Sequence, residues 1–252
     1  MFNRALTRDI TQLLAARPEY NALLLNVIER NCHEDVRIIG NSVRIRDRTS
    51  GVYMFSGPAR DELESLLDER NGELDTFFIN DSSVMEAVLR KYPGATAVEY
   101  QSYVLQRKDY IPNQETREGV ELTTLDLSWL DFILEHYRDE EFGHEHYISD
   151  RILHGPGIGL LYWGQKAAFG LQHKDGETGP IVVDAKWRDM GLGTYVVCAL
   201  NRLLFKRNSM LICFVKPGNL ASAHMMMNSG YQATGNNVLW VYRKLNNTLY
   251  LP

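Results

Sequence analysis

One segment, residues 180–205, constrains what this chain can fold into more than any other. The apolar run Pro180 to Val183 predicts a buried strand, and Thr194 to Phe205 predicts a helix. The loop between them ends in Gly191-Leu192-Gly193. A strand, a short loop with Gly-x-Gly and a helix start can direct backbone N–H groups at an anion, and glycines let the backbone approach a bulky ligand. The segment therefore predicts a phosphate-bearing cofactor and, with it, an enzyme.

Composition and charge narrow the class of protein. The 252 residues are 44% hydrophobic and 23% charged, which is typical of a soluble chain with a sizeable core in one or two domains. A net charge of −5 gives no basic surface and argues against a nucleic-acid partner. Cys32, Cys198 and Cys213 are scattered and predict reduced, buried thiols. No cysteine–histidine spacing typical of a metal site is present in the sequence, so we expect no metal.

Hydropathy along the chain predicts a cytoplasmic protein that does not enter a membrane. The N-terminal residues include Arg4, Arg8 and Asp9 and lack an uninterrupted apolar region long enough for a signal peptide. No run approaches the ~20 apolar residues of a membrane-spanning helix.

The first hundred residues alternate helix and strand patterns and predict a small α/β domain. Helices are predicted at 6–14, 20–28 and 62–67, with another opening at the capping box Ser83-Val84-Met85-Glu86, and strands at 36–45, 52–55, 77–79 and 98–105. Polar residues and Pro112 between Lys108 and Gly119 predict a linker. We therefore expect an N-terminal domain at 1–107, a linker at 108–118 and a C-terminal domain at 119–252.

The second half has its own order of elements. Strands are predicted at 120–124, 158–163, 166–172, 180–183, 210–215 and 238–243, and helices from Asp126 to Tyr137 and at 147–153, 191–205 and 220–228. A tight turn is expected at Gly164-Gln165. The resulting order is β-α-α-β-β-β-α-β-α-β, with a further strand allowed at the end.

This order, together with the glycine loop, resembles the GNAT superfamily of acyl-CoA-dependent N-acyltransferases. The family signature Arg/Gln-x-x-Gly-x-Gly/Ala stands here as Arg188-Asp189-Met190-Gly191-Leu192-Gly193. A second family feature, an asparagine that opens a helix ending in Gly-aromatic, is similar to Asn219 with Gly230-Tyr231. The segment His173–Gly179 is similar to the branch related to glycine N-acyltransferases.

The resemblance covers residues 119–247 and implies an α/β fold with a mixed central sheet and helices on both faces. A smaller N-terminal α/β domain precedes it, and residues 1–107 are open to interpretation as a degenerate copy of the same fold. The activity implied is N-acyl transfer, in which an amine attacks the thioester of acetyl-CoA or a related acyl-CoA. The acceptor implied is a small-molecule or amino-acid-like primary amine.

The resemblance also implies which residues bind the cofactor. Backbone groups of the 181–183 strand would pair with the pantetheine arm, backbone N–H groups of 189–194 would hold the pyrophosphate, and Arg188 would add a cation. Asn219 would hydrogen-bond the pantetheine. The full set is Ile181, Val182, Val183, Arg188, Asp189, Met190, Gly191, Leu192, Gly193, Thr194, Asn219, Ser222 and Met226.

Catalysis requires a base for the amine, a donor for the thioester oxyanion and an acid for the thiolate. A backbone N–H near Val183 is a candidate oxyanion donor, and the candidate bases are His173 and Glu177, which flank a predicted hairpin turn. Met226 stands where the family commonly has a tyrosine acid, and methionine has no proton to donate. Either another group, with His224 as the first candidate and Tyr195 and Tyr231 as others, replaces it, or the thiolate leaves unassisted.

Several alternatives stay open at this stage. His144-Glu145-His146, with His136 nearby, lacks the spacing of a zinc site and predicts a solvated loop that borders the acceptor site. Because Met226 replaces the tyrosine, the chain could bind acyl-CoA without catalysis. An unrelated α/β enzyme with another phosphorylated ligand is a second alternative. The acceptor, the acyl length and the oligomeric state, with a homodimer as one option, also stay open.

Overall fold

The computed structural model describes residues 4–69, 76–111, 117–138 and 142–243. Residues 112–116 of the predicted linker lie outside them. By their contacts the residues form two units, one of 1–104, 214–219 and 233–252 and the other of 105–213 and 220–232. No helix within the described ranges is long and apolar enough to cross a membrane.

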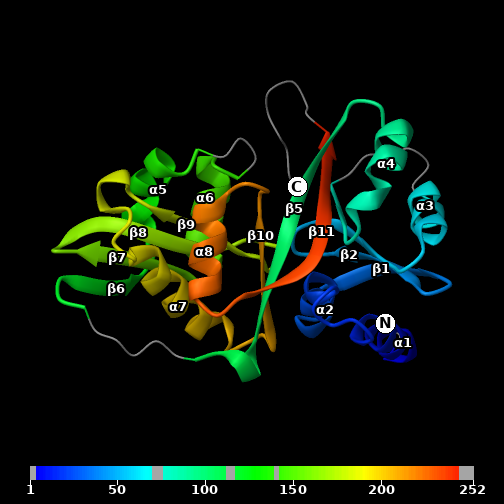
Figure 1. Cartoon of the computed structure of the whole chain (residues 1–252), viewed down its shortest axis with the longest axis horizontal. Coiled ribbons are helices and arrows are strands. Elements are labelled where there is room, and N and C mark those ends of the chain that lie inside the picture. The colour runs from blue at the N-terminus through cyan, green and yellow to red at the C-terminus, as the bar shows by residue number, and fades with distance from the viewer. Residues whose placement is uncertain (1–3, 70–75, 112–116, 139–141, 244–252) are drawn as a thin grey trace. The chain divides into compact units, whose positions relative to one another are not determined.

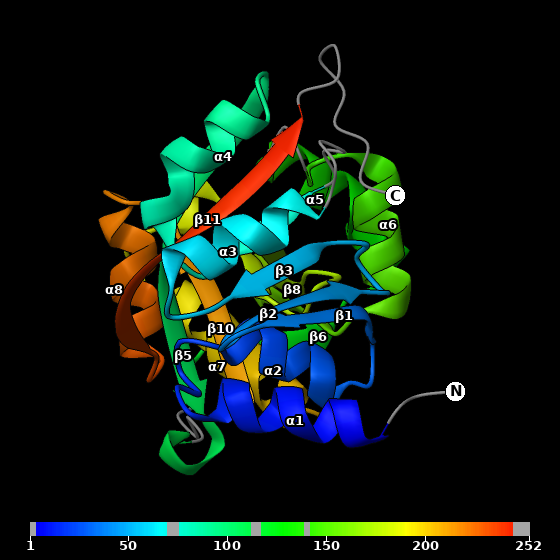
Figure 2. The ribbon, with the colours of Figure 1, turned by 90° about the vertical axis from the view of Figure 1, so that its right-hand side faces the viewer.

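In the described residues up to Gln106, the chain runs through four α-helices and five strands. The helices are α1 (Arg4–Ala15), α2 (Ala22–Glu29), α3 (Arg60–Asp68) and α4 (Met85–Lys91). The strands are β1 (His33–Ile39), β2 (Ser42–Asp47), β3 (Tyr53–Ser56), β4 (Phe77–Ile79) and β5 (Ala95–Gln106). Figures 1 and 2 show α1 and α2 side by side, on the opposite side of β1–β3 from α3. A cluster of buried side chains around Phe77 packs α3 and α4 onto this sheet, with Phe55 and Tyr92 in edge contact with the Phe77 ring.

The second part of the chain contains the elements expected from the sequence. Its strands are β6 (Val120–Thr124), β7 (Gly157–Tyr162), β8 (Gln165–Gln172), β9 (Thr178–Val183), β10 (Met210–Val215) and β11 (Gln232–Arg243). Its helices are α5 (Leu130–His136), α6 (Glu145–His154), α7 (Leu192–Leu204) and α8 (Leu220–Asn228). The predicted order is confirmed, with one long final strand in place of two. The order α-α-β-β-β-α-β-α-β from α5 to β11 is the same as that from α1 to β5.

The strands form two sheets. An antiparallel sheet has the order β6-β7-β8-β9, and a seven-stranded mixed sheet has the order β1-β2-β3-β4-β11-β5-β10. In the seven-stranded sheet β3 and β4 are parallel neighbours, while β4 and β11 are antiparallel. The predicted α/β class with a mixed sheet is therefore confirmed.

Side-chain alternation along β8 explains how helices cover both faces of the four-stranded sheet. Phe169 and Leu171 belong to the buried cluster formed with α5 and α6. Between them, a Cβ at Gly170 would lie 2.7 Å from Val196 Cγ1 of α7. Successive residues of a strand point to opposite faces, so α7 packs closely on the face opposite α5 and α6, and only glycine fits at that point.

Two local predictions were wrong. The single strand expected at 36–45 is broken at Gly40, whose φ of +55° and Asn41 neighbour make the tight turn between β1 and β2. The helix cap expected at Ser83 is supplied by Asp81, whose Oδ1 accepts from the Ser83 N–H at 2.9 Å. In both places a short turn residue competes successfully with the longer pattern.

Candidate functional site

The candidate site is built on β9, the loop after it and the start of α7. β9 is an edge strand of its sheet, and residues 181–183 pair with β8 on one edge only. Residues 210–213 of β10 belong to the same unit as β9, yet β10 pairs into the other sheet. Within the described part of the chain, no strand pairs with the second edge of β9, which leaves that edge open to an extended ligand except at Val183 O, which accepts from Arg188 Nε.

The loop after β9 is fixed by its own side chains. Asp184 Oδ1 accepts from the Lys186 N–H at 3.1 Å and starts a turn of 3₁₀ helix at Ala185–Trp187. Arg188 Nε donates back to Val183 O at 3.3 Å. Arg117 donates to Met190 O. The loop is therefore held at its start and near its end while Arg188 stays exposed.

Gly191 and Gly193 have different roles in this loop. Gly191 is the N-cap of α7, with a φ of +74° and nothing within 4 Å of the position of a Cβ. A side chain there would be strained and would project into the open space in front of the helix. At Gly193, in contrast, a Cβ would lie 2.6 Å from Met225 Sδ, so this glycine permits the packing of α7 against α8.

The start of α7 has the properties of an anion site. The first N–H groups of a helix have no partner within it, and the helix dipole favours negative charge there. One predicted donor is already used, because the Thr194 N–H donates to Gly191 O at 3.2 Å. Open space at Gly191, the edge of β9 and the exposed Arg188 together fit the pyrophosphate and pantetheine of an acyl-CoA.

The structure separates the three predicted cofactor residues near α8. Asn219 directly precedes the helix, and its N–H donates to Lys216 O at 3.0 Å. Ser222 is half-buried in the first turn. Met226 is only 1% exposed and packs in the core, whereas Met225 is the methionine that faces Gly193 beside Val183. The sequence spacing predicted that Met226 would lie near the glycine loop. In the structure Met225, on the neighbouring face of α8, has that position instead.

The turn between β8 and β9 is buried, not solvated. His173 is 9% exposed and Asp175 is 6% exposed. His173 Nδ1 lies 2.7 Å from Tyr147 Oη of α6, and the Phe142 ring packs on the imidazole with centroids 4.7 Å apart. Opposite this turn β9 bulges at Gly179-Pro180, because β9 advances three residues while β8 advances two. A Cβ at Gly179 would be 3.8 Å from His173 Nε2, so the ring borders the bulge.

The Tyr147–His173 pair favours one tautomer. Burial, followed by the nearby Asp175 carboxylate, raises the pKa of Tyr147 well above its usual value and keeps the phenol protonated. Tyr147 Oη accepts from the Lys174 N–H at 3.4 Å, which leaves its own proton for His173 Nδ1. A neutral imidazole then carries its hydrogen on Nε2. In this state His173 is a hydrogen-bond donor at the bulge, and Glu177 is the better candidate base.

Glu177 lies near three buried side chains, those of Tyr147, Cys213 and Tyr231. It is half-buried directly before β9, and its carboxylate contributes to raising the pKa values of Tyr147, Cys213 and Tyr231, for which burial is the largest cause. The Tyr231 hydroxyl donates to Asn201 Oδ1 at 2.9 Å and lies 3.1 Å from Thr178 Oγ1. Glu177 is thus a half-buried ionisable residue close to these buried groups.

The remaining histidines are not part of this group. His224 is exposed on α8. His144 and His146 are exposed before and within the first turn of α6. His136 Nε2, however, lies 3.7 Å from Asp184 Oδ2, at the start of the glycine loop. His136 was predicted to lie near the loop histidines, and its contact with Asp184 was not predicted because nothing in the spacing joins residues 136 and 184.

Tyr147, Thr178, Asn201 and Met225 were also missed as site residues. Their only sequence signal is a polar or flexible side chain inside an otherwise apolar helix or strand, such as Asn201 in α7, which is fully buried.

Comparisons with known proteins agree with this geometry. Residues 157–241 match the family described as FR47-like protein. A Drosophila protein structure is 15% identical, covers 98% of each chain and has a TM-score of 0.70. A GCN5-related N-acetyltransferase from Kribbella flavida is 13% identical over 90% of this chain and 95% of its own, with a TM-score of 0.56.

A GCN5-related N-acetyltransferase-like protein from Streptococcus suis is 15% identical over 94% of this chain and 98% of its own, with a TM-score of 0.55. This chain has the GNAT fold. The GNAT fold that the resemblance implies is confirmed, while the glycine N-acyltransferase branch stays a prediction. No curated protein matches the chain in sequence. The GNAT fold removes the alternative of an unrelated α/β fold.

Proposed function

We propose that this protein is an N-acyltransferase that moves an acetyl or related acyl group from acyl-CoA to a small primary amine. The observation that carries the proposal is the free edge of β9 leading into the Gly191 helix start, beside a buried polar turn. Acyl-CoA supplies the acyl group as a thioester. The second edge of β9 would hold the pantetheine amides, and the start of α7 with Arg188 would hold the pyrophosphate.

The residues at the start of β9 would then act on the amine. Glu177 would take the proton that the attacking nitrogen loses as the C–N bond forms. Backbone N–H groups of 181–183, with His173 Nε2 bordering the bulge, are the donors that could stabilise the oxyanion. The C–S bond breaks and CoA leaves as the thiolate. Because Met226 is buried and cannot donate, that departure would need no acid from position 226.

A panel of amines tests this function. The intact protein is incubated with acetyl-CoA and each amine, thiol release is followed by a colorimetric reagent, and the acylated product is verified by mass spectrometry. We expect at least one amine to give product, with turnover lost in Glu177→Gln. Thiol release without an acylated amine, or no turnover with any amine, would contradict transferase activity.

A second candidate function is favoured by the same Met226. A GNAT-fold module that binds acyl-CoA without transferring it needs no acid at that position. Saturable binding of acetyl-CoA combined with no product from the whole amine panel would support this candidate over the enzyme.

A further inference from the structure

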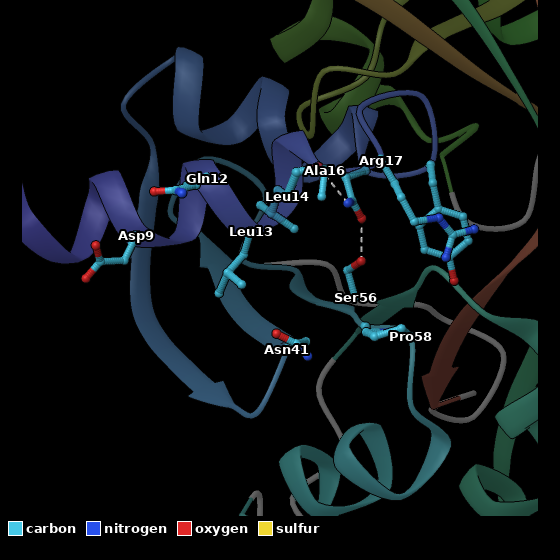
Figure 3. Close-up of a pocket in the computed structure, with 12 residues that line it drawn as sticks. Asp9, Gln12, Leu13, Leu14, Ala16, Arg17, Asn41, Ser56 and Pro58 are labelled. Atoms are coloured by element: carbon cyan, nitrogen blue, oxygen red, sulfur yellow. Dashed lines mark hydrogen bonds between the residues drawn. The ribbon is translucent and has the colours of Figure 1, made fainter.

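A cavity of about 590 Å³ lies in the first unit, at the carboxyl end of β3 (Figure 3). Its walls come from α1, the segment between α1 and α2, the turn between β1 and β2, and the connection from β3 to α3. In sheets with parallel strands, ligands bind outside the carboxyl ends of those strands, and β3 is parallel to β4. The volume is within the range of small-molecule pockets.

The polar floor of this cavity is already organised. Ser56 Oγ donates to Asn21 Oδ1, which also accepts from Asn80 Nδ2 at 3.1 Å. Asn21 Nδ2 donates to Leu14 O at 2.8 Å. These three side chains are buried and bonded to one another, so the floor is rigid without a ligand.

The walls are mainly apolar. Leu13 points from α1 towards Asn41 of the β1–β2 turn, and Pro58 lies beyond it on the far side (Figure 3). Leu14 of α1 and Ala16, which directly follows the helix, also line this side. An apolar body of a ligand would therefore be covered by Leu13 and Pro58, while Asn41 supplies a polar contact.

Arg17 places a fixed cation at one end of the cavity. Its guanidinium carbon lies 3.9 Å from the centroid of the Tyr20 ring. Burial, followed by the charge of Asp81, raises the pKa of Tyr20 to about 12, so the ring under the cation is neutral at physiological pH. Among the described residues Arg17 forms no ion pair, and its edge donors suit a carboxylate. Stacking restricts the side chain before any ligand arrives.

The other charges limit the ligand to a single negative charge. Among the described lining residues, Arg17 and Asp9 are the only arginine, lysine or acidic side chains, and they lie at opposite ends of the labelled group (Figure 3). A dianionic phosphate would have one cation for two charges and would meet the repulsion of Asp9. The connection at 57–59 also contains Pro58, which has no N–H for a phosphate.

We propose that this cavity binds a small organic monocarboxylate, with its carboxylate on Arg17 and its apolar body between Leu13 and Pro58. The proposal is independent of acyl transfer, since every residue that carries it lies in the first unit. The site differs from the glycine loop in using a side-chain cation instead of backbone N–H groups.

The test uses 3-phenylpropanoate as the probe and the ¹⁵N-labelled full chain. We expect saturable amide shifts at Tyr20, Asn21 and Asn41, and binding at least about fivefold weaker for the neutral 3-phenylpropanamide. Arg17→Gln should weaken carboxylate binding about tenfold. Arg8→Gln removes an exposed arginine of α1 that does not line the cavity, and should leave binding unchanged.

A variant that fills the cavity tests whether the probe binds inside it. Leu13→Trp should abolish the shifts while the rest of the amide spectrum shows a folded chain. No saturable shift in the parent protein, equal binding of the amide, or unchanged binding by Arg17→Gln would each overturn the proposal. Titration of acetyl-CoA on the same samples reports on the second unit separately, so failure of one site is distinguishable from failure of the other.

Discussion

The two parts of the chain share an order of helices and strands but differ where a ligand would enter. From α1 to β5 the parallel strands β3 and β4 are neighbours, paired from Tyr53↔Phe77 to Phe55↔Ile79. From α5 to β11 the corresponding strands β9 and β10 belong to different sheets. Backbone hydrogen bonds thus close one strand pair and leave the edge of β9 free. One order of elements can therefore give a closed or an open pair of strands, depending on a single pairing.

The connections from β3 to α3 and from β9 to α7 also differ in how open they are to a ligand. The segment from β3 to α3 is 57–59, and that from β9 to α7 is 184–191. The short connection contains Pro58, which lacks an N–H, whereas the long one ends in Gly191 with open space in front of it. The second connection is therefore the one that leads through an open glycine into a helix start, which is the feature we propose for the pyrophosphate.

The hairpin turns also use their acidic residues differently. Asp47 at the end of β2 is fully buried, accepts from Ser50 Oγ at 2.8 Å and pairs with Arg30 at 3.4 Å. Glu177 before β9 is half-buried beside the Tyr231 group. The first carboxylate is used to hold the fold, and the second is available for chemistry.

The largest effect is expected from replacing the two acidic residues, Glu177 and Asp47, by their amides. Glu177→Gln should lower kcat of acyl transfer by ~10²–10⁴-fold, because the amine proton loses its acceptor, with little change in acetyl-CoA affinity. Asp47→Asn should leave kcat unchanged and lower the free energy of unfolding by ~3 kcal/mol, because Arg30 loses its buried partner. Steady-state kinetics and urea unfolding separate the two. A loss of kcat in Asp47→Asn equal to that in Glu177→Gln would contradict the division of roles.

Leucine at two left-handed glycines sharpens the comparison of the connections. Gly191→Leu should weaken acetyl-CoA binding ~100-fold or more, since the side chain would fill the space before α7. Gly94 in the first unit has a φ of +92° and also has nothing within 4 Å of a Cβ. Gly94→Leu should therefore carry a similar backbone strain of ~1–2 kcal/mol and bind acetyl-CoA like the parent, as measured by competition. Equal loss in both variants would mean that strain, not occupancy, explains the effect.

Two buried tyrosines give a smaller effect on stability. The Tyr231 hydroxyl donates to Asn201 of α7, and the Tyr92 hydroxyl donates to Leu67 O of α3 at 3.1 Å. Asn201 Nδ2 already has no hydrogen-bond partner among the described protein atoms. Tyr231→Phe should lower the free energy of unfolding by ~1–3 kcal/mol and Tyr92→Phe by ~0.5–1.5 kcal/mol, as measured by urea unfolding. A larger loss of unfolding free energy in Tyr92→Phe than in Tyr231→Phe would contradict the greater importance of the Tyr231–Asn201 hydrogen bond.

The smallest effect is at alkaline pH. The raised pKa of Tyr20, about 12 against 10.0, means that the folded chain keeps the phenol proton more tightly than the unfolded chain. Its contribution to stability is therefore complete below pH 10 and is lost as pH rises from 10 to about 12. In Tyr20→Phe the fall in unfolding free energy across this range should be shallower, as measured by urea unfolding at each pH. An unchanged slope would show that Tyr20 ionises alike in both states.

Much of the fold follows from the sequence because local patterns decide it. The strand at 120–124, the Asp126 cap and the strand–glycine loop–helix segment all depend on neighbours within a few residues, and the structure has each of them. The break at Gly40 and the cap at Asp81 were missed because a single glycine in one place, and a single aspartate in the other, outweighed the longer pattern around it.

The site was less predictable because its contacts join distant residues. Tyr147 and His173 are brought together by α6 packing on β8, and Met225 replaces Met226 at Gly193 through the rotation of one helix. The strand pairing that leaves β9 with a free edge depends on the whole sheet order, which no local pattern contains.

The central claim is that the second part of the chain binds acyl-CoA and the first does not. Isothermal titration of acetyl-CoA into the intact protein, with CoA and NAD as comparisons, tests it most directly. We predict that one acetyl-CoA binds per chain with saturation, that CoA also binds and that NAD does not. No binding of either CoA species, or two equivalents per chain, would contradict it.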